Sequence, residues 1–260
     1  MKKIKIANQK GGVGKTSAAI HLAIGLALGG YSVLLVDGDA QGHCAARLGT
    51  AAFGGLYRLL VQEAEWKDVL REPAAANWAG SLRREGRLLL LPSNIETRAI
   101  PMLIDNPMLL RERLAELEGS VDVAIFDSDP TPSLLHQLLY LASDWVIYPT
   151  KCEMLSLDGL AKSLLHFKQQ NEARGGYSLD PLKLLGVLPT MYREQLNAHR
   201  YGLKLLAQQF GAAAIWTPLK DLTVWRDCEY EAKSLFAYAP DHEATKQMMQ
   251  VVERVAAYVQ

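Results

Sequence analysis

A glycine-rich loop lies near the start of the chain, between a short apolar run and an amphipathic one. The loop reads Lys10-Gly11-Gly12-Val13-Gly14-Lys15-Thr16, after the apolar run Ile4 to Ala7 and before the amphipathic run Ser17 to Leu28. Because glycine has no Cβ, backbone N–H groups of such a loop can close around an anion, and the N-terminus of the next helix adds partial positive charge. The pattern predicts a strand, a phosphate-binding loop and a helix.

The last two residues of the loop carry the side chains that this chemistry needs. Lys15 is placed to reach the β- and γ-phosphates of a nucleotide, and the Thr16 hydroxyl is placed to ligate Mg²⁺. The general phosphate-loop pattern G-x-x-x-x-G-K-[ST] would have glycine at Gln9, so the chain departs from it. A lysine, Lys10, stands directly before Gly11 instead.

The form K-G-G-V-G-K-T resembles the deviant Walker A motif of the ParA/MinD family of ATPases, and of its ParA/Soj-type partition members in particular. In that family the first lysine crosses a dimer interface and touches phosphates bound by the partner subunit, so the resemblance implies this role for Lys10. It also implies ATP and Mg²⁺ as cofactors. The implied nucleotide contacts in this segment are Lys10, Gly11, Gly12, Val13, Gly14, Lys15, Thr16 and Ser17.

Strand-like apolar runs alternate with helix-length periodic segments along the chain. The predicted strands are Lys3–Ala7, Ser32–Val36, Arg87–Leu91, Val121–Phe126, Trp145–Tyr148 and Leu182–Leu188, with a shorter candidate at Ala213–Trp216. The predicted helices are Thr16–Leu28, Pro107–Leu117, Leu134–Ala142, Leu157–Gln170, Asn197–Phe210 and His242–Val259. Such alternation predicts an α/β fold with a doubly wound, mostly parallel sheet and helices on both faces. We expect one P-loop ATPase domain over residues 1–260, with Glu63–Arg87 as an inserted excursion.

Three aspartates follow two of the predicted strands. Asp37 and Asp39 come after the second strand, and Asp127 comes after the fourth, where loops at the carboxyl edge of a parallel sheet surround a ligand. The first pair resembles the family's D-x-D-P-Q-G, with Ala40 in place of proline. The resemblance implies that Asp39 organises the attacking water, with Lys10 and Lys15 as the other catalytic residues. It implies that Thr16, Asp37 and Asp127 serve the metal.

The segment after Asp127 departs from the family. The family reads D-T-P-P-S, whereas this chain has Ser128, Asp129 and Pro130 after Asp127. The added carboxylate of Asp129 could ligate Mg²⁺, bind a water or turn outward to solvent, and the sequence does not decide among these.

Later segments extend the resemblance over almost the whole chain, with weaker motifs after Thr190. Residues 148–160 resemble the family's P-x-x-C-E…L-x-G-L segment. Residues 186–192 resemble its sixth strand and the loop near the nucleotide, which implies a nucleotide contact for Met191. Trp216-Thr217-Pro218 resembles the segment that packs on adenine, which implies one for Pro218.

The net charge of the chain does not indicate a strong positive electrostatic field that would attract nucleic acid. The 260 residues include 28 basic and 28 acidic ones, so the formal net charge is zero, and any DNA binding must come from a local patch. Family members bind nonspecific DNA through basic residues of their C-terminal half. By this resemblance Arg193, Lys220 and Arg226 are the candidates, although acidic residues are interleaved with them.

Other features bear on location and on competing functions. Three widely spaced cysteines without a C-x-x-C pair favour a reducing compartment. No secretory leader pattern and no run of 18 apolar residues occur, so we expect a cytoplasmic, nucleoid-associated protein. The six histidines show no metal-ligand spacing, and ordinary core or surface roles are favoured for them.

The resemblance implies an ATP-dependent homodimer with weak intrinsic ATPase turnover. It would bind nonspecific DNA, and a ParB-like or adaptor protein would stimulate hydrolysis to partition or position a cargo.

A MinD-like membrane-cycling ATPase is the alternative. The apolar stripe of the last helix, Val251, Val252, Val255, Ala256 and Val259, looks core-facing rather than membrane-facing. An iron–sulfur reductase lacks matched cysteines. A non-hydrolysing adaptor is disfavoured by Asp39.

Overall fold

A computed structural model of the chain describes residues 1–130 and 133–259. Its centre is a six-stranded sheet in the order β3-β2-β4-β1-β5-β6, and all five strand pairings are parallel. The strands are β1 Lys2–Ile6, β2 Ser32–Gly38, β3 Arg87–Leu91, β4 Val123–Ser128, β5 Trp145–Lys151 and β6 Lys183–Thr190. The predicted α/β fold with a parallel sheet is confirmed.

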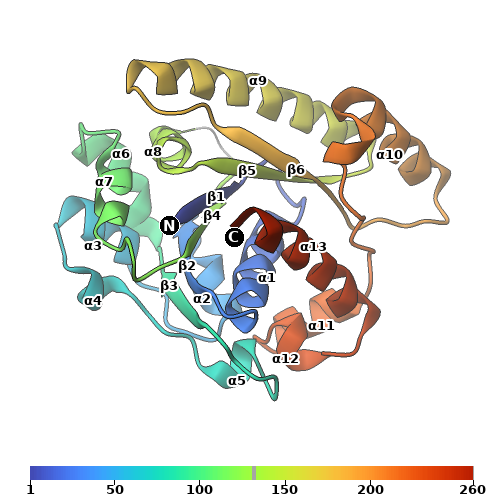
Figure 1. Cartoon of the computed structure of the whole chain (residues 1–260), viewed down its shortest axis with the longest axis horizontal. Helices are drawn as coiled ribbons and strands as arrows, with labels where there is room; N and C mark the ends of the chain where they lie inside the picture. The colour runs from blue at the N-terminus through green and yellow to red at the C-terminus, as the bar shows by residue number, and fades with distance from the viewer. Residues whose placement is uncertain (131–132, 260) are drawn as a thin grey trace.

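Helices cover both faces of this sheet (Figure 1). Helices α1 (Lys15–Leu28) and α13 (Glu243–Val259) pack side by side on one face, whereas the long helix α9 (Met154–Gly176) lies along the other, near β5 and β6. The remaining helices are α2 His43–Arg47, α3 Gly55–Val61, α4 Trp66–Val69, α5 Ala75–Trp78, α6 Ile100–Leu103, α7 Leu109–Ala115, α8 Leu134–Ala142, α10 Asn197–Phe210, α11 Val224–Tyr230 and α12 Leu235–Tyr238, with 3₁₀ turns η1 Ile95–Ala99 and η2 Ala212–Ala214.

Three apolar clusters follow from the alternation of side chains along the strands. Ile4 and Ile6 of β1 point to the α1 face, where the first cluster lies. The opposite face carries two clusters, one around β2, β3 and β4 under α3, α7 and α8, and one around β5 and β6 under α9 and α10. Since both faces are covered, the strands read as continuous apolar runs.

The predicted elements differ from the observed ones in a few informative places. Strands β2 and β4 run on through Asp37 and Asp127, because their parallel ladder pairs these two residues and then Gly38 with Ser128. The strand candidate Ala213–Trp216 is wrong. Ala212–Ala214 forms a 3₁₀ turn, and only Ile215 makes a bridge, with Val187. The excursion at 63–87 contains the short helices α4 and α5, as a helical insertion would.

The apolar stripe of the C-terminal helix faces the core, as the sequence predicted. Val251, Val252 and Val255 are buried, and α13 packs on α1. A Cβ at Gly25 of α1 would lie 2.3 Å from Val252 Cγ2, so glycine is needed for this close helix approach. In residues 1–130 and 133–259, no helix combines the length and the apolar character needed to cross a membrane.

Strand β1 carries an unusual residue at its centre. The Lys5 side chain is fully buried, and its ammonium lies 4.6 Å from the ring centroid of Tyr140. No hydrogen-bond partner for Lys5 Nζ exists within the described part of the chain. Burial lowers the pKa of Lys5 to about 7, against an opposing effect of Asp127. The fold tolerates this amine at a cost, since an unpaired buried charge is unfavourable.

We expect the Lys5→Met variant to be more stable than the wild type, by about 2–3 kcal/mol at pH 6. The pKa of Lys5 is depressed on folding, so between its folded value near 7 and its unfolded value near 10.5 the unfolded state binds more protons. Wild-type stability therefore rises through that window. The advantage of the variant should shrink between pH 7 and pH 10, which denaturant unfolding at several pH values measures. A destabilised variant at pH 6 would contradict this account of Lys5.

Candidate functional site

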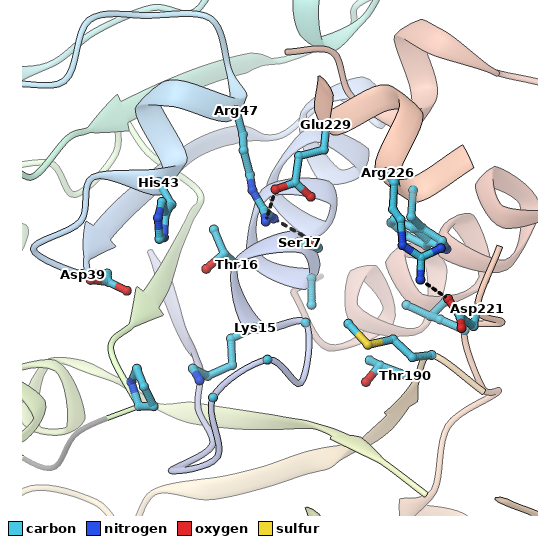
Figure 2. A pocket seen from close by; sticks show the side chains of 18 of the residues that line it. Lys15, Thr16, Ser17, Asp39, His43, Arg47, Thr190, Asp221, Arg226 and Glu229 are labelled. Carbon is cyan, nitrogen blue, oxygen red and sulfur yellow. Dashed lines mark hydrogen bonds and ion pairs between the residues drawn. The ribbon is translucent and has the colours of Figure 1, made fainter. Parts of the chain in front are cut away.

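A cavity of about 450 Å³ opens at the carboxyl edge of the sheet. The glycine-rich loop forms its floor, from Gly11 to Ser17, with Val13 buried beneath. Asp39, Ser128 and Pro130 line one end, and Thr190, Met191, Leu219, Lys220 and Asp221 line the other. Figure 2 shows Lys15, Thr16 and Ser17 along the floor, with Asp39 and Thr190 on opposite sides of them. The volume is in the range of small-molecule sites.

The loop has the conformation that an anion cradle requires. Gly12 and Gly14 have φ values of 68° and 82°, a left-handed region that other residues rarely adopt. Helix α1 begins at Lys15, and its first bond to the loop runs from Ala18 N to Gly14 O at 2.9 Å. The N–H groups at the start of a helix have no partner inside it, so they are available to an anion above the loop.

Lys15 lies on the floor of the cavity. Its side chain is mostly buried, and its ammonium donates a hydrogen bond to the Lys10 carbonyl at 3.1 Å. Burial lowers the pKa of Lys15, while Asp127, Asp129 and Asp39 act in the opposite direction. The lysine is thus held between the loop and three carboxylates, at the place where the sequence predicted a phosphate contact.

Lys10 is exposed at the outer side of the loop. Its N–H donates to Asn8 Oδ1 at 2.8 Å, which fixes the backbone. A Cβ on Gly159 of α9 would lie 2.9 Å from Lys10 Cβ, so the glycine of the L-x-G-L segment makes room for this lysine. An exposed cation beside a phosphate-binding loop is free to meet a second molecule.

Asp37 and Asp127 face each other on neighbouring strands, fully buried. Asp37 accepts hydrogen bonds from Asp39 N at 3.1 Å and Cys44 N at 3.0 Å, and the Cys44 thiol donates to Asp127 Oδ2 at 3.7 Å. A Cβ at Gly38 would lie 2.7 Å from the Asp127 carbonyl oxygen, so only glycine permits this close pairing.

The two carboxylates are an unfavourable pair without a cation. Burial, and then the charge of Asp127, raises the pKa of Asp37 to about 7. Burial likewise raises the pKa of Asp127, against a hydrogen bond from Thr16. Asp127 Oδ1 is buried and has no hydrogen-bond partner among the described residues. Together with the Thr16 hydroxyl these oxygens suit Mg²⁺, which prefers oxygen ligands and takes one or two carboxylates.

Asp39 lines the cavity, and Asp129 lies in the chain between two residues that do, Ser128 and Pro130. Asp39 is half-buried, and its Oδ1 accepts a hydrogen bond from Gln41 N at 2.9 Å. Asp129 is also half-buried, its carbonyl contacts His136 Nε2, and its charge acts on Lys15. Asp129 is therefore part of the acidic surroundings of Lys15, and not a carboxylate turned wholly to solvent.

The opposite end of the cavity agrees with the sequence prediction only in part. Met191 lines it with a φ of 50°, a strained value for methionine, and Thr190 donates to Val13 O at 2.9 Å. Trp216, however, is buried in the core beside Gly186. Leu219 lines the cavity, and the half-buried Pro218 is not among the residues that do. The nucleotide contact of Pro218 stays a prediction.

Arg193, Lys220 and Arg226 are each paired with an acid. Asp221 accepts from Arg193 Nε at 2.7 Å and from Arg226 Nη2 at 2.9 Å. Lys220 Nζ lies 2.6 Å from Glu243. Lys220 and Arg226 also line the cavity, whereas Arg193 does not. The three basic side chains thus lie among acidic ones. As an anion-binding patch they are weaker than the sequence alone suggested.

Sequence reasoning missed Arg47, Trp225 and Glu229, which also line the cavity, and gave His43 no special role although it lies at the rim. Arg47 comes from α2, directly after the D-x-D loop, and Trp225 and Glu229 are spaced i, i+4 on α11. The spacing of Trp225 and Glu229 was available in the sequence and places the two side chains on one face of a helix. It could not show that helices so distant in sequence lie beside the loop.

Proteins with similar sequences include chromosome-partitioning ATPases. Residues 1–175 match a family model described as an AAA domain. The chain is 34% identical to the chromosome-partitioning ATPase Soj of Thermus thermophilus, over 100% of this chain and 97% of that protein. It is 30% identical to the chromosome partitioning protein ParA of Caulobacter vibrioides, over 80% of this chain and 76% of that protein.

Solved structures share the fold at lower identity. Cobyrinic acid a,c-diamide synthase of Mycobacterium smegmatis, with an ATP analogue and magnesium, has a TM-score of 0.79 at 24% identity and covers 99% of this chain and 95% of its own. At 24% identity, this structural likeness shows the fold alone. The relatives found by sequence show the family to which the chain belongs.

Proposed function

Because this chain belongs to the ParA/MinD family of P-loop ATPases, we propose that it positions a cargo by ATP-dependent dimerisation and nonspecific DNA binding. The observation that carries this proposal is the joint placement of Lys10, Lys15 and Asp39 around one cavity. Lys15 and Asp39 line it, and Lys10 stands exposed at the outer side of the same loop. This arrangement supports a site that a second subunit would complete.

In this proposal the cavity holds ATP and Mg²⁺. The loop N–H groups and Lys15 bind the phosphates, and the base lies toward Met191 and Leu219. Thr16, Asp37 and Asp127 serve the metal, which supplies charge neutralisation of the phosphates when bound. The names of two solved neighbours include an ATP analogue with magnesium and ATP, in agreement with these cofactors.

Hydrolysis requires a positioned water and charge at the leaving phosphates. Asp39 orients the water, because its half-buried carboxylate stands at the same end of the cavity as the predicted metal ligands. Lys10 binds the phosphates held by the partner subunit. The resulting homodimer binds nonspecific DNA, and a ParB-like or adaptor protein accelerates a slow intrinsic turnover.

The membrane-cycling alternative has less support. Its hallmark would be an amphipathic terminal helix with a free apolar face. In this chain Val251, Val252 and Val255 of α13 are buried against the body of the protein. The C-terminal helix is therefore occupied in packing, and DNA is the preferred carrier.

We expect Lys10→Ala to stay folded and monomeric with little ATPase activity. Loss of a charge-assisted contact to phosphate across the interface costs about 2–3 kcal/mol or more. The N–H of residue 10 still donates to Asn8, so the loop keeps its shape and binds ATP within the monomer. Light scattering with an ATP analogue and a phosphate-release assay measure the two effects. Wild-type dimerisation together with wild-type turnover would refute the role of Lys10.

We expect replacement of Arg193, Lys220 and Arg226 by glutamate to lower the affinity for nonspecific DNA by about tenfold or more at moderate salt. Two of these residues line the cavity, so ATP binding must be measured in the same variant. The single variant Arg193→Glu avoids the cavity and should show part of the loss. Normal DNA binding by the triple variant, with ATP binding intact, would place the DNA surface elsewhere.

A further inference from the structure

Arg47 bridges three elements at the middle of the cavity. It comes from α2, and its Nη1 donates to Ser17 Oγ at 2.6 Å on α1. Its Nη2 donates to Glu229 Oε1 at 2.5 Å on α11. Figure 2 shows the guanidinium reaching down from α2, with dashed lines to both partners. The side chain is about one quarter exposed, so it is held in place while still open to the cavity.

The position of Ser17 indicates which part of a nucleotide would meet Arg47. Lys15, Thr16 and Ser17 run in order along the start of α1, and Lys15 and Thr16 serve the terminal phosphates and the metal. Asp39 marks the terminal-phosphate end, and Met191 and Leu219 mark the base end. Ser17 lies between these ends, where the phosphate attached to the ribose must pass. Arg47, bonded to Ser17, stands over the same point.

We propose that Arg47 is an additional nucleotide-binding residue, whose guanidinium binds the α-phosphate while Glu229 holds it in position. The inference rests on the proposed ATPase function and adds a residue to its site. The guanidinium fork presents parallel N–H donors that suit phosphate oxygens. One nitrogen stays on Glu229, while the nitrogen now bonded to Ser17 turns to the phosphate oxygen.

Charge supports this assignment. Around the mouth of the cavity, Arg226 is bonded to Asp221 and Lys220 to Glu243. Arg47 has one carboxylate partner and one neutral hydroxyl partner, so part of its hydrogen-bonding capacity can pass to an anion without breaking the ion pair. The pair with Glu229 is partly exposed and adds little to folding stability by itself. Its value is geometric, because it sets the direction of the guanidinium.

The test is a calorimetric titration of the full chain with ATP, ADP and the two diastereomers of ATP that carry sulfur on the α-phosphate. We expect Arg47→Ala to lower the affinities for ATP and for ADP by the same factor, about tenfold or more, because both nucleotides carry the α-phosphate. The wild type should prefer one diastereomer, since sulfur accepts a charged hydrogen bond less well than oxygen. Arg47→Ala should lose that preference, and Arg47→Lys and Glu229→Gln should give intermediate affinities.

A matched control is Arg87→Ala, which removes an arginine from an exposed pair with Glu72 away from the cavity. It should leave both affinities unchanged, and the melting temperatures without nucleotide report whether each variant is folded. Weaker ATP binding with unchanged ADP binding would overturn the α-phosphate assignment. The assignment would also be overturned if the wild type showed no preference between the diastereomers, or if Arg47→Ala kept the preference. A wild type that binds no nucleotide would overturn the proposed function itself, whereas equal binding by wild type and Arg47→Ala would overturn only this inference.

Discussion

The Lys15→Ala variant should lose ATP binding by a factor of about 100 or more. Lys15 is mostly buried on the cavity floor, where Asp127, Asp129 and Asp39 surround it. Removing its ammonium would delete the proposed charge-assisted contact to two phosphates and would leave those acids uncompensated next to an anionic ligand. Both effects act against the nucleotide and in the same direction.

A labelled ATP analogue measures this loss in an equilibrium titration. Lys162→Ala is a suitable control, because Lys162 is an exposed lysine paired with Asp158 on α9 and does not line the cavity. It should bind as the wild type does. Wild-type affinity in a folded Lys15→Ala variant would remove the basis for the phosphate-loop assignment.

The Asp39→Ala variant should hydrolyse ATP about 100-fold more slowly or worse, while it still binds ATP and dimerises. Asp39 is half-buried at the cavity, where we propose that the phosphates bind, and its Oδ1 receives a hydrogen bond from Gln41 N. It does not belong to the buried Asp37–Asp127 pair, so its loss should affect the water more than the metal. The trapped ATP dimer should remain on DNA.

Single-turnover phosphate release and retention on DNA test this second expectation together. Asp105→Ala, at an exposed position that does not line the cavity, is the control. Normal turnover in Asp39→Ala would assign the positioning of the water to another residue. Failure to dimerise would show instead that Asp39 acts in binding.

Sequence reasoning was most successful where the relevant residues are close together along the chain. The glycines and Lys15 are consecutive, and Asp37 and Asp127 each end an apolar run, so their meeting follows from the parallel sheet. What it could not predict depends on contacts between distant segments. Arg47 and Glu229 are 182 residues apart and meet only when α11 folds over α1 and α2.

The same limit explains two differences near the C-terminus. Ala213–Trp216 has the apolar character of a strand, but only one bridge to β6 forms, so the chain turns and places Leu219 at the cavity. Arg193 and Arg226 look like free basic residues in sequence. In the structure Asp221 accepts hydrogen bonds from both, and a list of charges does not contain that pairing.

We expect ATP to switch this protein onto DNA, and retention on immobilised nonspecific DNA tests this most directly. The wild type should bind with ATP and weakly or not at all with ADP or without nucleotide. Because a two-fold dimer doubles the basic contacts and the counterions released, binding should weaken steeply with added salt. Equal retention in all three nucleotide states, or no retention in any, would contradict the claim.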